Sequence, residues 1–420
     1  MGSPYSRVKS VFVQIASYRD PQLVPTLRDM FAKADYPEYL NVCIAWQRSE
    51  VETLEEFSNH PQFKVLDIPH TESKGACWAR NLIQQNYSGE EFTLQLDSHM
   101  RFAKGWDTEL IKVYNELKAA GHKKPLLTAY LPSFDPDIHP EGTKNEAWQM
   151  NFDRFTSDGI VLFSAGQIDS DYLAFPIPSR FYSAHFCFTS GDFCKEVPHD
   201  PNLYFHGEEI SISVRAYTWG YDMFHPVKSV IWHEYTRKNR TKHWDEHLEW
   251  WHADKRSRQR VRVLLGMEEP KEQLDFGPYG LGPERTIRDY ELYSALCFLT
   301  RSIDPYRISM LAGTFKILAP YDKWVEYLQY VFKYCIDIPK GTINPDNHDF
   351  WYVAFLDTGG EEIYRQDVGT DELEYLKHTP PHQENYHVWR TFYPKTPPVS
   401  WKVWPHSKEG KWGNPIQGKV

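Results

Sequence analysis

The sequence predicts an α/β protein in which a largely parallel, helix-covered sheet is followed by a small β-rich domain. Short apolar runs alternate with amphipathic helical patterns through residues 1–100. Beyond about residue 300, short strand-like runs separated by turns replace that alternation. A chain of 420 residues is also too long for one ordinary core. We therefore expect a larger domain over 1–300 and a mainly β domain over 301–420.

Four strands and two helices are expected in the first part of the chain. The strands are short apolar runs at 11–16, 40–46, 63–68 and 92–96. Asp20 can cap the first helix, and Pro21 suits the first helical position. The apolar face of this helix contains Leu23, Leu27, Met30 and Phe31. In the second helix, one face is formed by Gly75, Ala79, Leu82 and Ile83.

The middle of the chain is less regular. Strand-like runs mixed with prolines between 128 and 183 predict long loops that frame a cleft. A helix is expected to open at Gly207 and to close at Gly220. Further expected elements are a strand at 227–232 and helices at 243–265 and 285–299.

The last part of the chain predicts a small β-sandwich. After a helical stretch around 322–334, strand-like runs occur at 350–356, 362–364, 387–392 and 399–404. No cluster of metal-ligand type is apparent in this part of the sequence. An interaction domain and a purely structural support are both compatible with the pattern.

Charge, hydropathy and cysteine content disfavour several classes of protein. The net charge of −10 disfavours a general nucleic-acid binder, which needs a positive field. No apolar run approaches the roughly 20 residues of a membrane-spanning helix, and the N-terminus lacks the pattern of a signal peptide. The six cysteines form no C-x-x-C pair, which favours free thiols over a zinc knuckle. We expect a cytoplasmic protein without a membrane span.

A metal site is predicted where the fourth expected strand ends. Asp97 and His99 alternate with Ser98, so their side chains point the same way on an extended segment and can share one ion. Ligands of open α/β sheets lie beyond the carboxyl ends of the strands. A carboxylate with an imidazole suits Mn²⁺ better than Mg²⁺. The alternative is that D-x-H occurs by chance and Asp97 caps a turn.

His233 is the candidate third ligand, because it also ends an apolar strand and enters a polar loop. The cations of that loop can fold over a diphosphate; they are Arg237, Lys238, Arg240 and Lys242. The alternative makes His233 a packing histidine in front of a solvated loop. Glu208 and Glu209 open a helix, where they either complement its dipole or bind substrate close to the reacting carbon.

A set of motifs resembles the polypeptide N-acetylglucosaminyltransferase family, whose best-known members modify hydroxyproline on a cytoplasmic ubiquitin-ligase subunit. The resemblance covers about residues 10–300. Its motifs are Ser17-Tyr18-Arg19-Asp20, Trp78-Ala79-Arg80-Asn81, Leu94-Gln95-Leu96-Asp97-Ser98-His99, Trp106-Asp107, Phe205-His206-Gly207-Glu208-Glu209 and Gly280-Leu281-Gly282. A more distant similarity links the chain to the mucin-type polypeptide GalNAc-transferases. The last domain differs from their secreted lectin domain, because paired cysteines are absent.

The resemblance implies a GT-A (Rossmann-like, nucleotide-sugar-binding) fold, a UDP-sugar donor, Mn²⁺ and transfer with retention of anomeric configuration. It implies that Asp97, His99 and His233 bind the metal and that Glu208 or Glu209 lies at the reaction centre. By the same resemblance, the donor contacts are Ser17, Tyr18, Arg19, Arg80 and Asn81, with Asp97 reaching the donor through the metal.

The activity expected from this resemblance is transfer of GlcNAc from UDP-GlcNAc to a hydroxyl, on a polypeptide serine, threonine or hydroxyproline. One alternative keeps the fold but uses UDP-Glc, UDP-Gal or UDP-GalNAc with a glycan or small-molecule acceptor. Two others are a metal-dependent phosphoesterase using Asp97, His99 and His233, and a noncatalytic carbohydrate-binding scaffold.

Overall fold

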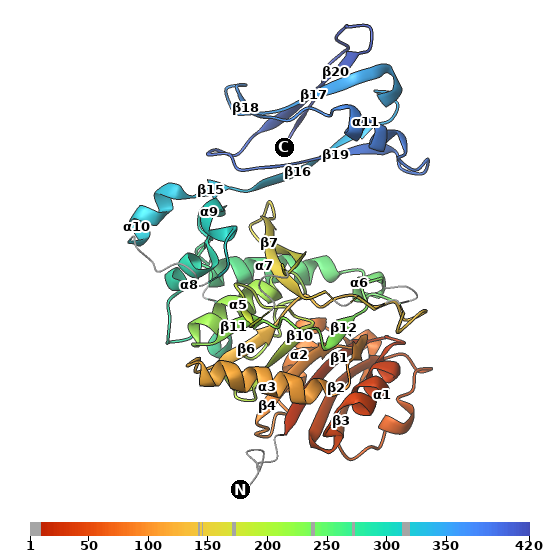
Figure 1. Cartoon of the computed structure of the whole chain (residues 1–420), viewed down its shortest axis with the longest axis vertical. Coiled ribbons are helices and arrows are strands. Elements are labelled where there is room, and N and C mark those ends of the chain that lie inside the picture. Colours follow the sequence, from red (N-terminus) through yellow and green to blue (C-terminus); the bar gives the residue numbers. More distant parts are fainter. Residues whose placement is uncertain are drawn as a thin grey trace. The chain divides into compact units, whose positions relative to one another are not determined.

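The structure is a computed structural model that describes residues 10–141, 143–144, 146–169, 174–236, 240–270, 274–312 and 320–420. The chain divides into two compact units (Figure 1). The first unit contains residues 1–294 and 307–318, and the second contains residues 295–306 and 319–420.

The first unit is built on a mixed sheet with the strand order β3-β2-β1-β4-β10-β6-β11-β9. These strands are β1 (Val11–Tyr18), β2 (Leu40–Arg48), β3 (Phe63–Pro69), β4 (Phe92–Asp97), β6 (Pro125–Thr128), β9 (Ile177–Pro178), β10 (Phe186–Ser190) and β11 (Asp222–His225). The first four run parallel, whereas β10 is antiparallel to both β4 and β6. Because β1 pairs with β4 in parallel and Ala16 lies opposite Asp97, their carboxyl ends meet at one edge.

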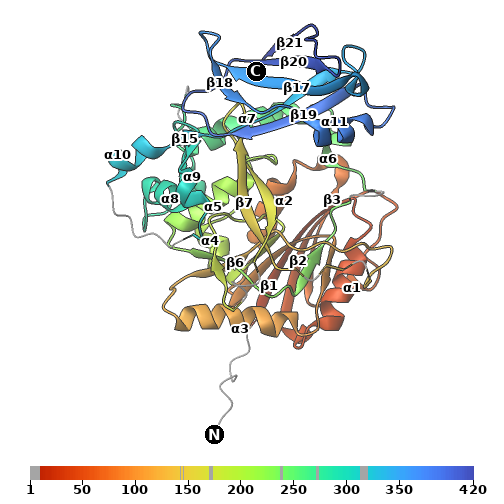
Figure 2. The same ribbon diagram turned by 45° about the horizontal axis from the view of Figure 1, so that its top comes forward.

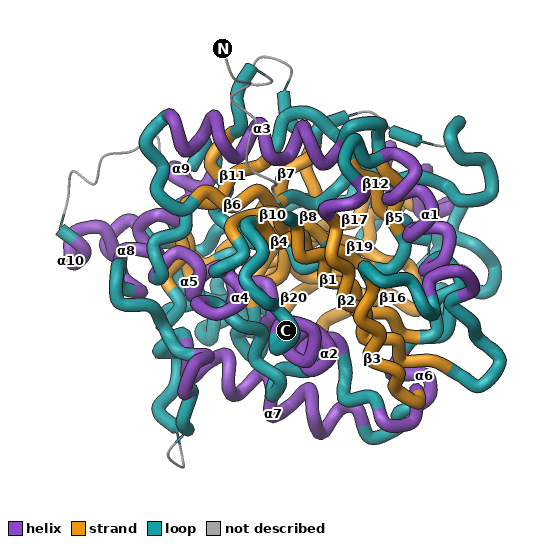
Figure 3. The backbone as a smooth tube through the Cα atoms, turned by 90° about the horizontal axis from the view of Figure 1, so that it is seen from below, coloured by secondary structure: helices purple, strands orange, loops and turns teal. Residues whose placement is uncertain are grey.

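Helices cover both faces of this sheet. The described helices of the first unit that come before residue 295 are α1 (Leu23–Lys33), α2 (Ala76–Gln84), α3 (Trp106–Ala119), α4 (Phe193–Glu196), α5 (Glu208–Thr218), α6 (His243–Glu246), α7 (Trp250–Leu264) and α8 (Ile287–Ser294). α1 and α3 contribute to the large core cluster on one face, and α2 packs on the other. Figure 3 shows α3 and α2 on opposite sides of the strands. Alternation along β1 explains this arrangement, since Val13 faces the first cluster and Phe12 the second.

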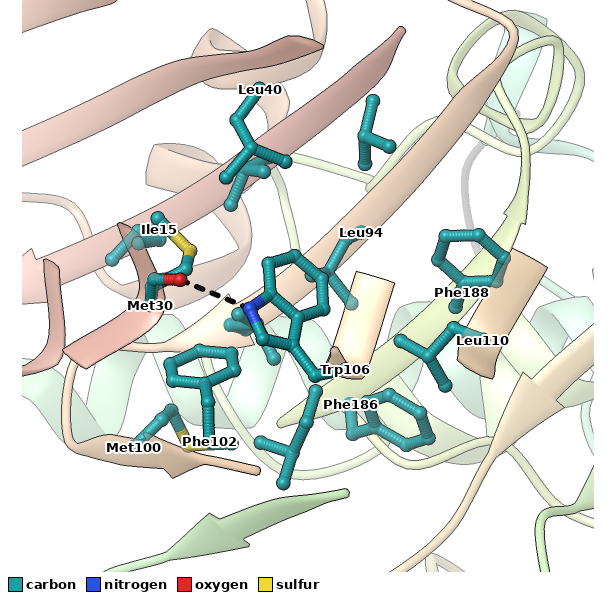
Figure 4. Close-up of a cluster of buried hydrophobic side chains, with 14 of the residues drawn as sticks. Ile15, Met30, Leu40, Leu94, Met100, Phe102, Trp106, Leu110, Phe186 and Phe188 are labelled. Carbon is teal, nitrogen blue, oxygen red and sulfur yellow. Dashed lines mark hydrogen bonds between the residues drawn. The ribbon is translucent and has the colours of Figure 1, made fainter. Parts of the chain in front are cut away.

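Trp106 lies at the centre of the large core cluster (Figure 4). Its side chain is fully buried, and its indole N–H donates to the Met30 carbonyl at 3.0 Å. The buried polar atom is therefore satisfied while the ring fills the space between α1, α3 and the sheet. This packing fixes the sheet edge from which the candidate site is built.

Two small sheets lie outside the main one. β5 (Met100–Phe102) pairs with β12 (Ile231–His233), and β7 (Trp148–Phe155) forms a hairpin with β8 (Val161–Gln167). The β5–β12 pair matters for function because it places His233 opposite Met100, one residue beyond His99.

The second unit contains a small sheet of order β13-β14-β15 and two further sheets that share one core cluster (Figure 2). One sheet pairs β16 (Phe332–Pro339) with β19 (Asn385–Phe392); the other has the order β18-β17-β20-β21. The latter strands are β17 (His348–Leu356), β18 (Glu362–Arg365), β20 (Ser400–Ser407) and β21 (Ile416–Lys419). The remaining elements after residue 295 are β13 (Leu296–Cys297), β14 (Ser302–Ile303), α9 (Pro305–Ile308), α10 (Tyr321–Trp324), β15 (Gln329–Tyr330) and α11 (Thr370–Lys377).

The predicted fold class is confirmed, as are the four early strands, the first two helices, the helix that begins after Gly207 and the late β-strands. Several local predictions are wrong. Asp20 does not cap α1, which begins at Leu23; it accepts a hydrogen bond from the Gln22 N–H instead. The hairpin β7–β8 and the strand β11 lie in the middle of the chain, where the pattern is irregular, and the sequence did not predict them as separate elements.

Three predicted helices are shorter than expected. The helix at 243–265 is interrupted after Glu246, where His247 leaves the helical conformation and contacts the His70 carbonyl. The helix at 285–299 ends at Ser294, because Ala295 adopts a positive φ of 63°. The helical stretch around 322–334 ends at Tyr327, after α10 and a 3-10 turn at Val325–Tyr327, and β15 and the start of β16 follow it. None of the helices in the described part of the chain has the length and apolar character to span a bilayer.

Candidate active site

Three side chains predicted to bind metal converge at the carboxyl edge of the main sheet. Asp97 ends β4, His99 lies in the short link to β5, and His233 ends β12. The backbone of His233 is fixed by β5 and by hydrogen bonds with Pro132 and Phe134. The donor atoms of the three side chains lie within 4.8 Å of one another, so they could hold one metal ion.

The spacing of the donor atoms suits one cation. His99 Nε2 lies 3.0 Å from His233 Nε2, and Asp97 Oδ2 lies 3.2 Å from His233 Nε2 and 3.6 Å from His99 Nε2. Two ligands at right angles, each about 2.1 Å from an ion, are about 3.0 Å apart. The three atoms therefore need to move by only a few tenths of an ångström to occupy one face of an octahedral site.

The charge states of the ligands also fit a metal. Burial opposes ionisation of Asp97, but the His233 hydrogen bond and the Arg80 guanidinium hold its pKa well below the usual range. Burial lowers the pKa of His233 to about 4, despite the neighbouring Asp97. A neutral imidazole and an ionised carboxylate are the forms that bind metal.

Asp20 orients His99 from behind. Its Oδ2 accepts hydrogen bonds from His99 Nδ1 at 2.7 Å, from Ser98 Oγ at 2.7 Å and from Arg240 Nη1 at 3.1 Å. Burial opposes the ionisation of Asp20, yet these donors hold its pKa well below the usual range. A proton on Nδ1 leaves the Nε2 lone pair of His99 facing Asp97 and His233, as metal binding requires.

We predict that Asp20→Asn weakens Mn²⁺ binding about 10- to 100-fold while the chain stays folded, because His99 loses the charge that fixes its tautomer. The affinity would be measured by titrating Mn²⁺ into the full chain. Asp158→Asn serves as the control, since Asp158 pairs with Arg258 and lies outside the centre. Equal affinities for Asp20→Asn and the unaltered chain would contradict the orienting role.

Arg80 joins the metal centre to Glu208. Its Nη2 donates to Asp97 Oδ1 at 2.8 Å, and its Nη1 donates to both Glu208 oxygens at 2.6 and 2.7 Å. Because Arg80 occupies Oδ1 of Asp97, Oδ2 remains directed toward the two histidines. Burial raises the pKa of Glu208, but Arg80 and His199 outweigh it and bring the pKa to about 2.

Gly207 allows Glu208 to begin α5 in this position. Gly207 has a φ of 93°, and a Cβ there would lie 2.7 Å from Cγ2 of Val261. A residue with a side chain would therefore be strained and would clash. The structure thus brings Asp97, His99, His233, Arg80 and Glu208 into one connected group of contacts.

Glu209 points away from this group. Its Oε1 accepts from the Ala184 N–H at 3.0 Å, and its Oε2 contacts the Tyr130 hydroxyl at 2.9 Å. Tyr130 stacks on His185, whose ring stacks on His233 at a centroid distance of 4.4 Å. Two stacked rings, those of Tyr130 and His185, therefore lie between Glu209 and His233. Burial raises its pKa to about 7.

The raised pKa of Glu209 predicts a pH dependence of folding. The folded chain holds this proton up to about pH 7, whereas the ordinary value is 4.5, so the stability that Glu209 contributes is lost as the pH rises between these values. Between pH 5 and 8, ionisation of Glu209 should lower the free energy of unfolding by up to about 3 kcal/mol. Glu209→Gln mimics the protonated form, so the variant should not show this decrease.

The measurement is urea unfolding at several pH values, and the difference between variant and unaltered chain should grow with pH. Glu116→Gln on α3 is the control, since the Glu116 side chain is 56% exposed. A pH-independent difference would show that Glu209 is already ionised at pH 5.

Ser17, Tyr18 and Arg19 lie at the end of β1, beside the metal centre in the sheet. Ser17 is buried, whereas Tyr18 and Arg19 are both bound to Glu246 of α6; the Tyr18 hydroxyl donates to Glu246 at 2.5 Å. His70 contacts the same carboxylate at 3.1 Å. The predicted donor-binding residues Tyr18 and Arg19 thus already converge on a negatively charged group.

Asn81 does not join the group around the metal. Its Nδ2 donates to the His199 carbonyl at 2.8 Å and to the Tyr279 hydroxyl at 3.2 Å, and its Oδ1 accepts from Gln85. Among the predicted loop cations, Arg240 reaches Asp20, whereas Arg237 and Lys238 lie outside the described residues. Lys242 precedes α6, and its backbone N–H donates to Asp245 Oδ2 at 3.0 Å.

A cavity of about 830 Å³ lies near the end of β1. Its wall includes Tyr204 and His243, and the His243 ring lies 5.1 Å from that of Tyr18. The lining comes from residues 73–74, 201–204, 243–260 and 274. The loops between 128 and 183, expected to frame a cleft, do not line this cavity.

Sequence reasoning missed Asp20 and His185 as parts of the site. His185 Nε2 accepts from the Leu131 N–H at 3.1 Å, so it supports His233 by stacking rather than by binding metal. Asp20 lies in a recognised motif, but its contact with His99 spans 79 residues. The signal that could have revealed it is an acidic residue directly after the first strand of a parallel sheet.

Comparison with known proteins identifies the family. A family model described as "Glycosyltransferase (GlcNAc)" matches residues 10–59 and 50–299, well over half of the chain. No curated protein matches the sequence significantly.

Several solved structures are similar at low identity. S. aureus TarS 1–349 is 16% identical, with a TM-score of 0.37, over 54% of this chain and 60% of that chain. GalNAc-T7, solved with UDP, GalNAc and Mn²⁺, is 14% identical, with a TM-score of 0.42, over 67% of this chain and 54% of that chain. TarS 1–349 in complex with UDP-GlcNAc gives 16% identity and a TM-score of 0.38, over 63% of this chain and 68% of that chain.

The chain thus spans 60% and 54% of the first two of these proteins. The family match extends from the first strand to beyond α8 and includes every residue of the metal centre described above. The chain, with its α/β fold, belongs to the glycosyltransferase (GlcNAc) family.

Proposed function

We propose that the chain transfers GlcNAc from UDP-GlcNAc to a polypeptide hydroxyl, on serine, threonine or hydroxyproline, with retention of anomeric configuration. The observation that carries the proposal is the convergence of Asp97, His99 and His233 in a chain of the GlcNAc glycosyltransferase family. The domain over 1–300 would perform the reaction, and the domain over 301–420 would be an accessory domain.

In this proposal Asp97, His99 and His233 hold Mn²⁺, which fits their mixed oxygen and nitrogen donors. When bound, the cation neutralises the charge that develops on the departing UDP. Asp20 orients His99, and Arg80 holds Asp97 with one oxygen free. Because these contacts lie within the protein itself, they would limit the reorganisation that the reaction requires.

The donor would bind along the end of β1, contacting Ser17, Tyr18 and Arg19. Support comes from the sheet, because Ala16, the residue before Ser17, lies opposite the proposed metal ligand Asp97. Arg80 and Asn81 are also proposed donor contacts, and Glu208 or Glu209 is the proposed group at the reaction centre. Glu208 is the better placed of the two, because it shares Arg80 with Asp97.

The test is release of UDP with each of UDP-GlcNAc, UDP-GalNAc, UDP-Glc and UDP-Gal, in Mn²⁺ and after chelation. Mass spectrometry then identifies any polypeptide that has gained a sugar. We expect transfer with UDP-GlcNAc and Mn²⁺, loss of transfer on chelation and recovery when Mn²⁺ is restored. Preference for another UDP-hexose would show that UDP-GlcNAc is not the donor. Nucleotide monophosphate formed without sugar transfer would indicate a phosphoesterase.

We also propose a cytoplasmic location, which the cysteines support. All six are free, and five of them are buried. Proteins that fold in oxidising compartments commonly use such residues for disulfides. A disulfide found in the protein isolated from its source would argue against this location.

A further inference from the structure

The second unit contains a cluster of metal-ligand type that the sequence did not reveal. Cys335 and Asp337 lie on β16, and His387 lies on β19 directly opposite Asp337. Ile336, Ile338 and Val388 alternate with them and are buried in the core cluster. Because successive side chains of a strand point to opposite faces, Cys335, Asp337 and His387 share the outer face of this sheet.

The donor atoms of these residues surround one point. Cys335 Sγ lies 3.4 Å from Asp337 Oδ1 and 3.8 Å from His387 Nδ1, and the last two atoms are 2.7 Å apart. In tetrahedral zinc sites, ligand lengths of about 2.3 Å to sulfur and about 2.1 Å to nitrogen or oxygen place sulfur about 3.6 Å from the other donors. The two sulfur distances already match this value. Separating the carboxylate and imidazole to about 3.4 Å would complete the arrangement.

A catalytic thiol is a poorer explanation of the same residues. A cysteine–histidine–aspartate relay needs the thiol on one ring nitrogen and the carboxylate on the other. Here Nδ1 of His387 faces both Cys335 Sγ and Asp337 Oδ1. One nitrogen cannot take the thiol proton while it donates to the carboxylate, whereas a cation can bind all three atoms from one side.

We infer that Cys335, Asp337 and His387 form a zinc site in the second unit, separate from the candidate active site. Thiolate, imidazole and carboxylate donors together favour Zn²⁺ over Mg²⁺ or Mn²⁺. Binding releases the thiol proton to solvent and leaves a fourth position for water or another ligand. The bound ion would link β16 to β19 across 52 residues of sequence, and would stabilise the pairing of the two strands.

The test uses Co²⁺ as a spectroscopic substitute for Zn²⁺ in the full-length chain, under reducing conditions. Thiolate bound to Co²⁺ gives a near-ultraviolet charge-transfer band, which the centre at Asp97, His99 and His233 cannot give because it has no sulfur donor. We expect Co²⁺ in excess over the two candidate sites to produce this band, and an excess of Zn²⁺ to remove it. The band should persist in Asp97→Ala, so the result does not depend on the proposed transferase activity.

Cys335→Ser should abolish the band, and His387→Gln should weaken Co²⁺ binding at this site at least tenfold. His378→Gln is the matched control, because the His378 side chain is 78% exposed in the same unit. It should retain the band at full affinity. Absence of the band in the unaltered folded chain, or its survival in Cys335→Ser, would overturn the zinc site.

Discussion

Replacing Asp97 with alanine is expected to lower the rate of sugar transfer by three orders of magnitude or more, with the chain still folded. Asp97 supplies the only carboxylate of the three-residue metal centre. A metal clamp contributes several kcal/mol of charge stabilisation in the transition state, and each 1.36 kcal/mol is a factor of about ten in rate. The mutation also frees Arg80, which keeps its two hydrogen bonds to Glu208, so the fold retains its main partner there.

The measurement combines UDP release with Mn²⁺ titration of the same preparation. Asp192→Ala is the matched control: Asp192 is exposed and follows β10, whose end lies at the opposite edge of the sheet because β10 runs antiparallel to β4. It should keep normal turnover and metal affinity. If Asp97→Ala retained near-normal turnover, the metal centre assigned to these strand ends would be wrong.

The metal ligands could be predicted because their signals are local. The D-x-H spacing of Asp97 and His99 follows from strand alternation, and each ligand lies at or just after the end of an apolar strand. Parallel pairing of β1 and β4 then places Ser17 and Tyr18 near Asp97. These inferences need only the chain direction and the period of the strand.

The partners of these ligands could not be predicted in the same way. Arg80 and Glu208 were expected to contact the donor and the sugar, and in the structure they bind each other across 128 residues. Asp20 was expected to cap a helix, and it instead orients His99. Each outcome depends on which side chains tertiary packing buries together, and a buried charge takes the nearest opposite charge available.

Similar limits explain the interrupted helix and the second cluster of ligands. The pattern of 243–265 favours one helix, but contacts of His247 with the His70 carbonyl and the His243 ring interrupt it. Cys335 and His387 come together through the register of β16 and β19, which no local pattern specifies. Cross-strand register is set by the whole core, here by residues such as Ile336 and Val388 on the inner face.

The largest loss of stability is expected from Arg80→Met. Arg80 is buried between two carboxylates, of which Glu208 is itself buried. Removing one partner of a buried ion pair leaves an uncompensated charge, and this costs about 3–5 kcal/mol of unfolding free energy. The pKa of Glu208, which Arg80 and His199 bring to about 2, should rise as a consequence.

The loss can be assigned to the unpaired carboxylate by a second substitution. Arg80→Met combined with Glu208→Gln removes both charges, so the double variant should recover about 1 kcal/mol or more relative to Arg80→Met alone. Urea unfolding can be monitored by hydrogen exchange in peptides from α2 and α5, and these peptides report on the two helices directly. Arg48→Met is the control, because its pair with Asp67 is exposed and should cost less than about 1 kcal/mol. Equal costs for Arg80→Met and Arg48→Met would mean that water reaches the Arg80 pair, and the rigid support inferred for Asp97 would then be lost.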